Sequence, residues 1–232
     1  MAAAGPDRTT RTRKGDAPGG RKTPSRRHRE VLDAAAKVFY ERGYVDARVQ
    51  DIAAEVGLLK GSLYHYIDGK EDVLFRLLDE THDEVNQILD EMAALPDTEP
   101  PLDRLHEYVR RQIAYNMENL VRVSVYYRDL RCLSEPLLAQ ILERRREHEG
   151  FVRGLIVAAQ ERGEVDPDRE ALPLSKFIFA TIIWTYRWYS PARDSDREVD
   201  RRCADFAIHG LVGSGSPAAV VGGYTLPNRL VD

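Results

Sequence analysis

The spacing of apolar residues across positions 49–67 predicts two short helices separated by a tight turn. In VQDIAAEVGLLKGSLYHYI, Ile52, Ala53 and Val56 are spaced for one face of a helix, and a second apolar face begins just after Gly57. Gly57 can take the positive φ that such a turn requires, and the small Ala53 allows the two helices to pack closely. This pattern is typical of a helix-turn-helix, whose second helix enters the major groove of DNA.

The second helix of this motif is predicted to run from Lys60 to Tyr66. Leu63 faces inward, together with Leu59 or Ile67. The residues left on the outer side are Lys60, Gly61, Ser62, Tyr64, His65 and Tyr66. An ordinary helical hairpin with a solvated outer face is the alternative interpretation, because a short motif also matches by chance.

The outer residues have the chemistry of a DNA contact. Ser62 and His65 can bond base edges or phosphates, and Tyr64 and Tyr66 offer hydroxyls to phosphate oxygens. Gly61 is a poor helix former, and its missing side chain would let the backbone approach DNA closely.

The rest of the apolar pattern is helical, and no window shows the alternation of a β-strand. With the amphipathic run at 29–44, the chain is expected to form about nine helices in an all-α fold. Asp68 is the expected N-cap of the helix that starts at Lys70, and Gly163 is the expected end of a helix opened by Ser134. The later helices are predicted at Lys70 to Ala94, Leu102 to Asn119, Val121 to Leu133, Ser134 to Arg162, Asp168 to Tyr189 and Ser195 to Leu211.

Charge is divided unevenly along the chain. The net charge is −4, but residues 1–29 contain nine Lys or Arg and two Asp, a balance of +7, so the other 203 residues carry −11. A basic end beside the motif and an acidic body are typical of a protein with one end facing DNA. Residues 1–25 are expected to form a disordered basic arm, either a solvated tail or an arm that follows the DNA backbone. The arm lacks the apolar segment of a signal peptide.

The stretch GLLKGSLYHYIDGKEDVL, preceded by VQDIAAEV and REVLDAAAKVFYERGY, resembles the DNA-binding domain of the TetR family of transcriptional regulators over roughly Arg26 to Leu78. The resemblance implies three helices for DNA and a larger helical domain for ligand binding and dimerisation. It places Lys70 where the family commonly contacts phosphate. Arg48 stands where the family usually has a capping Ser or Thr, and is expected to meet phosphate instead. The expected domains are a basic arm at 1–25, a helix-turn-helix domain at 26–70, a ligand-binding and dimerisation domain at 71–212 and a flexible tail at 213–232.

The second half carries aromatic residues at helical spacing. The predicted ligand-binding residues are Tyr108, Tyr115, Met117, Tyr126, Tyr127, Trp184 and Trp188. A single aromatic residue is more often part of the core, whereas the set together predicts an apolar cavity with polar edges.

The segment WTYRWYSP and a final helix ending at Leu211 resemble, over about residues 104–211, a TetR subgroup that responds to acyl-coenzyme A thioesters and controls lipid and sterol breakdown. The resemblance implies an apolar effector such as an acyl-CoA thioester. The cations available for its phosphates are Arg128, Arg131, Arg144, Arg145, Arg146 and Arg153. The run ERRRE at 143–147 also fits a solvated helix face with internal ion pairs.

A single short recognition helix reads few base pairs, so a homodimer on palindromic, double-stranded operator DNA is expected. The predicted interface residues are Phe177, Ile178, Ile182, Phe206, Ile208 and Leu211. The leading interpretation is a cytoplasmic, ligand-responsive transcriptional repressor and not an enzyme. The alternatives are a nucleoid-type DNA binder without ligand control and an enzyme acting on acyl thioesters. The sequence has no nucleophile elbow, HExxH-like spacing or glycine-rich phosphate loop for the enzyme.

Cys132 and Cys203 lie far apart in the sequence, which predicts buried thiols in a reducing compartment and neither a disulfide nor a metal site. No cofactor is expected. The most apolar segment, residues 171–189, contains Pro173, Lys176 and Arg187, so no membrane partner is expected either.

Overall fold

The computed structural model describes residues 26–96, 98–194, 197–213, 220–221 and 224–225. Its helices are α1 (Arg26–Arg42), α2 (Val49–Glu55), α3 (Lys60–Leu63), α4 (Lys70–Ala93), α5 (Pro101–Glu118), α6 (Leu120–Asp129), the 3-10 helix η1 (Leu130–Cys132), α7 (Glu135–Glu161), α8 (Ala171–Trp188), α9 (Pro191–Asp194) and α10 (Val199–Val212). The fold class is all-α, as predicted. The expected basic arm lies outside the described residues.

Two short strands, β1 (Val220–Val221) and β2 (Tyr224–Thr225), pair antiparallel within the predicted tail. No strand was predicted there, because two-residue strands are too short to show an alternating pattern. Apart from these strands and Gly213, the tail lies outside the described residues.

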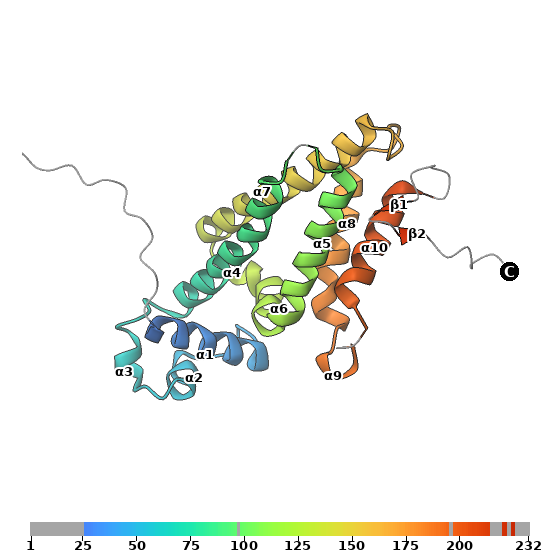
Figure 1. The fold of residues 1–232 in the computed structure, drawn as a ribbon. Helices are drawn as coiled ribbons and strands as arrows, with labels where there is room; N and C mark the ends of the chain where they lie inside the picture. Colours follow the sequence, from blue (N-terminus) through green and yellow to red (C-terminus); the bar gives the residue numbers. More distant parts are fainter. Residues whose placement is uncertain (1–25, 97, 195–196, 214–219, 222–223, 226–232) are drawn as a thin grey trace, which may run out of the picture.

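The helices form an elongated molecule with α1, α2 and α3 gathered at one end (Figure 1). Helix α4 leads from that end into the larger helical body, where α5 packs against α10 and α7 packs against α8. Helix α6 returns the chain to the first end and packs against both α1 and α4. The two ends of the molecule are therefore joined through α4 and α6.

The turn between α2 and α3 has the predicted geometry. Gly57 has a φ of 69°. The N–H of Leu58 donates to the carbonyl of Ala53 at 2.8 Å, and the N–H of Gly57 donates to Ala54 at 3.2 Å. This pair of bonds is the Schellman ending of a helix, which requires a left-handed residue at the position of Gly57. Glycine takes that conformation without the steric cost that a Cβ would bring.

Helix α3 is shorter than predicted, since it ends at Leu63 and not at Tyr66. Leu63 is fully buried and Ile67 is 2% exposed, whereas Leu59 is 80% exposed. The inward partner of Leu63 is thus Ile67, and Leu59 points to solvent at the start of the helix.

Two hydrophobic cores fill the molecule. The first combines α1 to α3 with the first half of α4, residues 73–78, and with parts of α6 and α7. The second combines the end of α4 with α5, the second half of α7, α8 and α10. Helix α4 belongs to both cores, so the predicted domain limit at residue 70 does not coincide with a break in packing. The domain limits stay a prediction.

The ends of two helices test the capping predictions. Gly163 has a φ of 72° and follows α7 directly after Arg162, which confirms the predicted stop. Asp68 was wrong as the N-cap of α4, because Gly69 occupies that position. The backbone N–H of Asp68 instead donates to the carboxylate of Asp72 at 3.0 Å.

Neither cysteine is fully buried: Cys132 is exposed and Cys203 is half-buried, so the prediction of buried thiols was wrong. Among the described helices, none combines the length and the apolar character that a bilayer crossing requires.

Candidate DNA-binding surface and effector cavity

The outer side of the helix-turn-helix presents side chains that are free to bind a partner. Lys60, Tyr64 and His65 are exposed, and Tyr64 retains 47% of its surface. Ser62 and Tyr66 are half-buried. The side chains of Lys60 and His65 form no hydrogen bond or ion pair within the described part of the chain. The surface can therefore donate to phosphates and base edges without first breaking internal contacts.

Gly61 lies exposed in the middle of this surface. A Cβ built on Gly61 would meet no atom within 4 Å, and its φ is not in the left-handed region. Neither packing nor backbone geometry inside the subunit requires a glycine there, which is consistent with close approach of an external partner such as DNA.

Arg48 begins α2 without using its side chain. Its backbone N–H donates to the carboxylate of Asp51 at 2.8 Å, and Asp51 also pairs with Arg42 at 2.8 Å. The acid three residues into the helix thus takes over the cap that Ser or Thr would provide. The exposed guanidinium of Arg48 stays available for phosphate.

Lys70 has a different role in the structure from the predicted phosphate contact. Its Nζ donates to the backbone carbonyls of Tyr44 (2.8 Å), Val45 (3.2 Å) and Ala47 (2.9 Å). The same ammonium lies 4.4 Å from the centre of the Tyr44 ring. An ammonium has three N–H donors, so these carbonyls occupy all of them. Lys70 fastens the start of α4 to the loop between α1 and α2, and it has no donor left for phosphate in this conformation.

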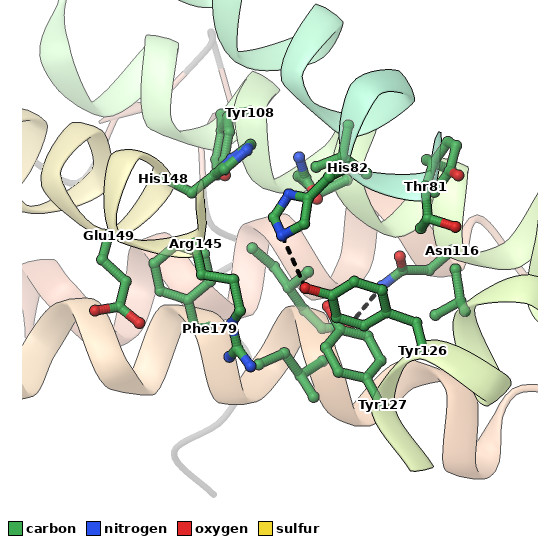
Figure 2. Close-up of a pocket in the computed structure, with 16 residues that line it drawn as sticks. Thr81, His82, Tyr108, Asn116, Tyr126, Tyr127, Arg145, His148, Glu149 and Phe179 are labelled. Atoms are coloured by element: carbon green, nitrogen blue, oxygen red, sulfur yellow. Dashed lines mark hydrogen bonds between the residues drawn. The ribbon is translucent and has the colours of Figure 1, made fainter. Parts of the chain in front are cut away.

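The larger helical body contains a cavity between α4, α5, α6, α7 and α8. Its volume is about 50 Å³. The lining residues are Thr81, His82, Val85, Tyr108, Gln112, Tyr115, Asn116, Val123, Tyr126, Tyr127, Arg145, His148, Glu149, Phe179, Ile182 and Ile183. Figure 2 shows the imidazole of His82 meeting the hydroxyl of Tyr126 inside the cavity, with Arg145 and Glu149 approaching from α7.

Four of the seven predicted ligand residues line this cavity: Tyr108, Tyr115, Tyr126 and Tyr127. The structure corrects the predicted place of the other three. Met117 packs against the second core, and Trp184 and Trp188 lie on the surface with 60% and 42% of their area exposed. The two tryptophans therefore face away from the cavity.

Buried hydrogen bonds organise the cavity wall. The hydroxyl of Tyr108 and Nδ1 of His148 are 2.7 Å apart, and Nε2 of His148 lies 2.6 Å from the amide oxygen of Asn86. Both bonds are made when Tyr108 donates to Nδ1 and Nε2–H donates to Asn86, which is the neutral form of His148. On the facing side, the hydroxyl of Tyr126 lies 2.8 Å from Nε2 of His82.

Burial keeps both histidines uncharged near neutral pH. It lowers the pKa of His148 to about 4, with a further contribution from the nearby Arg144. It lowers the pKa of His82 to about 3, again with Arg144 next in importance. Burial also raises the pKa of Tyr127 to about 12. The inner wall is thus polar but neutral.

Two polar atoms of this wall have no hydrogen-bond partner among the described residues: Nδ1 of His82 and Nε2 of Gln112. Both side chains are 5% exposed. Sequence reasoning did not select either residue. A signal was present in α5, where Gln112 interrupts an apolar face formed by Leu105, Tyr108 and Val109.

Of the six arginines considered for ligand phosphates, Arg145 alone lines the cavity. It forms no ion pair with any described residue. Arg144 is bound to Asp79 and Asp83, and Arg128 is bound to Asp129 and to carbonyls at the end of α1. The exposed Glu149, one turn after Arg145, places a negative charge at the same rim.

The last two long helices carry an exposed aromatic face, formed by Phe177, Trp184 and Trp188 of α8 and Phe206 of α10. Phe177 and Phe206 are 66% and 71% exposed. The structure corrects the other predicted interface residues, because Ile178, Ile182, Ile208 and Leu211 are at most 2% exposed and pack in the second core of the same chain.

Helix α6 links the cavity to α1. Its residues Val123, Tyr126 and Tyr127 line the cavity. On other sides of the helix, Arg122 pairs with Asp33 of α1 at 2.6 Å, and Arg128 donates to the backbone carbonyls at the end of α1. A shift of α6 would therefore reach the DNA-binding end through defined contacts.

The described residues include no group of three or more metal-binding side chains.

Two family models match the chain. Residues 31–77 match the bacterial regulatory proteins of the tetR family, and residues 98–211 match the tetracyclin repressor-like C-terminal domain. The HTH-type transcriptional repressor KstR2 of Mycobacterium tuberculosis is 29% identical over 171 residues, which are 71% of this chain and 82% of KstR2.

Solved structures share the fold. AibR in complex with isovaleryl coenzyme A and operator DNA has a TM-score of 0.70 and 25% identity, covering 80% of this chain and 98% of AibR. SCO3833 of Streptomyces coelicolor A3, a member of the TetR transcriptional regulator family, has a TM-score of 0.66 and 30% identity, covering 79% of this chain and 89% of SCO3833.

Proposed function

The chain belongs to the TetR family of bacterial regulatory proteins, and we propose that it is a homodimeric repressor released from a pseudo-palindromic operator by a coenzyme A thioester with an apolar acyl group. The complex of AibR with isovaleryl coenzyme A and operator DNA supports this effector class, as does the relationship to KstR2.

One observation carries the coupling between ligand and DNA: α4 takes part in both sites. Its first residue, Lys70, fastens the loop before α2, and its fourth turn supplies Thr81 and His82 to the cavity. The helix is continuous from Lys70 to Ala93, so a displacement at the cavity is transmitted to the helix-turn-helix.

The size of the cavity explains why a ligand would cause such a displacement. Its 50 Å³ is about a third of an engineered 150 Å³ cavity that accepts benzene. A five-carbon acyl group enters only if the walls move apart. A ligand shifts a conformational equilibrium by as much as it prefers one state, and here it binds only the opened state. The opened state is the one proposed to separate the two recognition helices from successive grooves.

The dimer that presents two recognition helices is proposed to form through the exposed aromatic face. Monomeric soluble proteins rarely leave large aromatic side chains grouped on the surface, and such groups mark interaction sites. Four helices, α8 and α10 from each subunit, would form the interface bundle. DNA contacts are proposed for Arg48, Lys60, Gly61, Ser62, Tyr64, His65 and Tyr66, with Lys70 in a supporting role.

The test is a fluorescence-anisotropy or gel-shift titration on DNA from upstream of the gene itself, with and without isovaleryl-CoA. We expect tight binding to one segment, competed poorly by unrelated DNA, and release by the thioester but not by coenzyme A. Absence of any specific segment would contradict the repressor assignment.

Two alternatives have distinct outcomes in the same experiment. A nucleoid-type binder without ligand control would bind unrelated DNA equally well and ignore the thioester. An enzyme acting on the thioester would convert it to a new species during incubation, which mass spectrometry would detect. We propose that the protein is not an enzyme and acts in the cytoplasm, where its operator lies.

A further inference from the structure

The polar atoms of the cavity differ in whether they are already paired. Thr81 donates to the carbonyl of Leu77 at 2.8 Å, and the amide of Asn116 donates to the carbonyl of Ile182 at 2.9 Å. The hydroxyl of Tyr108 is bonded to Nδ1 of His148, and the hydroxyl of Tyr126 is bonded to Nε2 of His82. These groups hold the wall together and have no need of a ligand.

Gln112 is the exception on α5. Its Nε2 is buried and has no partner among the described residues, while its side chain is 5% exposed and lines the cavity. A buried donor without an acceptor destabilises a fold, so nearly all such groups in native proteins are paired. Nδ1 of His82, on α4 across the same cavity, is unpaired as well.

The part of the cavity around Gln112 and His82 has no charged side chain among the described residues. The only charged side chains among the cavity's described lining residues are Arg145 and Glu149, and both lie on the more exposed α7 rim. His82 and His148 are neutral because burial lowers the pKa of each. A carboxylate or phosphate placed at Gln112 would lose its hydration without meeting a cation.

We propose that the buried end of the effector carries a neutral acceptor oxygen, a carbonyl of the thioester, ketone or ester kind, that accepts a hydrogen bond from Nε2 of Gln112. Gln112 is then the residue that distinguishes an acyl ligand from a hydrocarbon of the same shape. The anionic parts of the ligand lie at the outer edge of the cavity, beside Arg145. This inference rests on the proposed effector class and specifies how the cavity recognises it.

The first test needs no ligand. Replacing Gln112 with Met keeps the length of the side chain and removes the unpaired amide. We expect the midpoint of thermal unfolding of the free protein to rise by roughly 2 to 4 °C. The control Gln140→Met changes an exposed residue of α7 and should leave the midpoint unchanged. A lower midpoint for Gln112→Met would show that the amide has a structural partner and would overturn the proposal.

The second test uses two probes of the same shape that differ at a single non-hydrogen atom. 4-Methylpentan-2-one carries the isovaleryl group as a ketone, and 2,4-dimethylpent-1-ene replaces its oxygen with a CH₂ group. Both require the same opening of the cavity, so that cost cancels. We expect the wild type to bind the ketone about 10-fold more tightly, as for one hydrogen bond to a buried donor, and to shift the side-chain amide signal of Gln112 in NMR spectra.

Gln112→Met should bind the two probes with similar affinity, whereas Gln140→Met should keep the preference of the wild type. Equal affinities in the wild type, or no binding of the ketone up to its solubility limit, would overturn the proposal. The repressor function is judged separately by operator release with isovaleryl-CoA. Release without ketone preference would reject the role of Gln112 alone, and ketone preference without release would reject the thioester as effector.

Discussion

At the scale of single residues, Gly61 shows how an external partner can be inferred from a free protein. It lies in α3, where glycine is less favourable than alanine, and nothing within 4 Å would clash with a Cβ. The subunit alone would be more stable with alanine at this position. The glycine is therefore best explained by a surface that comes close to the backbone only when DNA is bound.

This explanation predicts that replacing Gly61 with Ala raises the stability of the free protein but weakens its binding to the operator. Gly61→Ala should stabilise the free protein by up to about 1 kcal/mol, because alanine is the better helix former. It should weaken operator binding roughly 10-fold, because the methyl group would hold the backbone away from DNA. Gly154→Ala is the matched control, since Gly154 is helical, exposed and free of neighbours within 4 Å, but lies in α7. Thermal unfolding and anisotropy titrations measure both effects. Unchanged DNA affinity in Gly61→Ala would remove the reason given for the glycine.

At the scale of elements, the start of α4 holds the loop between α1 and α2 through one side chain. The chain positions joined by Lys70 are 23 to 26 residues apart in sequence, and three backbone carbonyls of a single loop converge on its ammonium. Carbonyls at the end of a helix and in a loop carry partial negative charge, which a cation stabilises. Lys70 thus orients the entry to α2 and, through α2, the recognition helix.

Replacing Lys70 with Ala should cost roughly 2 kcal/mol, since three hydrogen bonds to a charged donor are lost from a partly exposed site. We expect faster hydrogen–deuterium exchange in residues 43–52 and weaker DNA binding on every sequence alike. Lys37→Ala removes an exposed ion pair with Glu55 and should change the stability much less than Lys70→Ala. If exchange in residues 43–52 were the same in both variants, the fastening role of Lys70 would be refuted.

The exposed aromatic face gives a second prediction at this scale. Phe206→Glu should convert the dimer into a monomer while leaving the fold intact, because Phe206 is 71% exposed and contributes little to its own subunit. Analytical ultracentrifugation would show the change, and operator affinity should fall at least 100-fold as the two half-sites uncouple. Leu142→Glu, an exposed apolar residue of α7, should remain dimeric. A dimeric Phe206→Glu would place the interface elsewhere.

The helix-turn-helix could be predicted from sequence because its signals are local. Gly57, the spacing of Ile52 and Ala53 and the buried Leu63 all lie within twelve residues and define the turn without help from the rest of the chain. Predictions in α8 were less accurate for a physical reason. That helix is apolar on several sides, with Ile178 and Ile182 buried but Phe177 and Trp184 exposed. Its apolar pattern therefore does not show which side faces the core.

Contacts between distant segments could not be predicted from the sequence either. The carbonyls bound by Lys70 belong to a loop more than 20 residues away in sequence. Whether the amide of Gln112 has a partner depends on how the five helices around the cavity pack. Backbone carbonyls have no signature in the sequence, and a polar residue on an apolar helix face does not reveal whether its partner is present. Four of the seven residues predicted for the cavity, all of them tyrosines, do line it, since helical spacing places them on the inner sides of α5 and α6.

At the scale of the whole molecule, the buried histidines connect the cavity to pH. An ordinary histidine has a pKa near 6.5, and burial lowers that of His148 to about 4 and that of His82 to about 3. Below pH 6.5 the unfolded chain gains protons that the folded chain does not, so stability falls as pH falls. The loss ends near pH 4 for His148 and near pH 3 for His82.

For His148 alone this loss is on the order of 3 kcal/mol between pH 6.5 and 4. Urea unfolding at a series of pH values should show a shallower dependence over this interval for His148→Gln than for the wild type. His209→Gln, at an exposed position of α10, should follow the wild type. Parallel curves for His148→Gln and the wild type would mean that His148 is not held neutral by the fold.

The small size of the cavity affects the rate of ligand binding as well as the affinity. A ligand that can enter only after five helices move apart binds more slowly than diffusion allows. The regulator would therefore average over brief changes in effector concentration. Because a bound acyl group keeps the cavity in its opened state, transcription would continue until that ligand dissociates, even after the free effector is consumed.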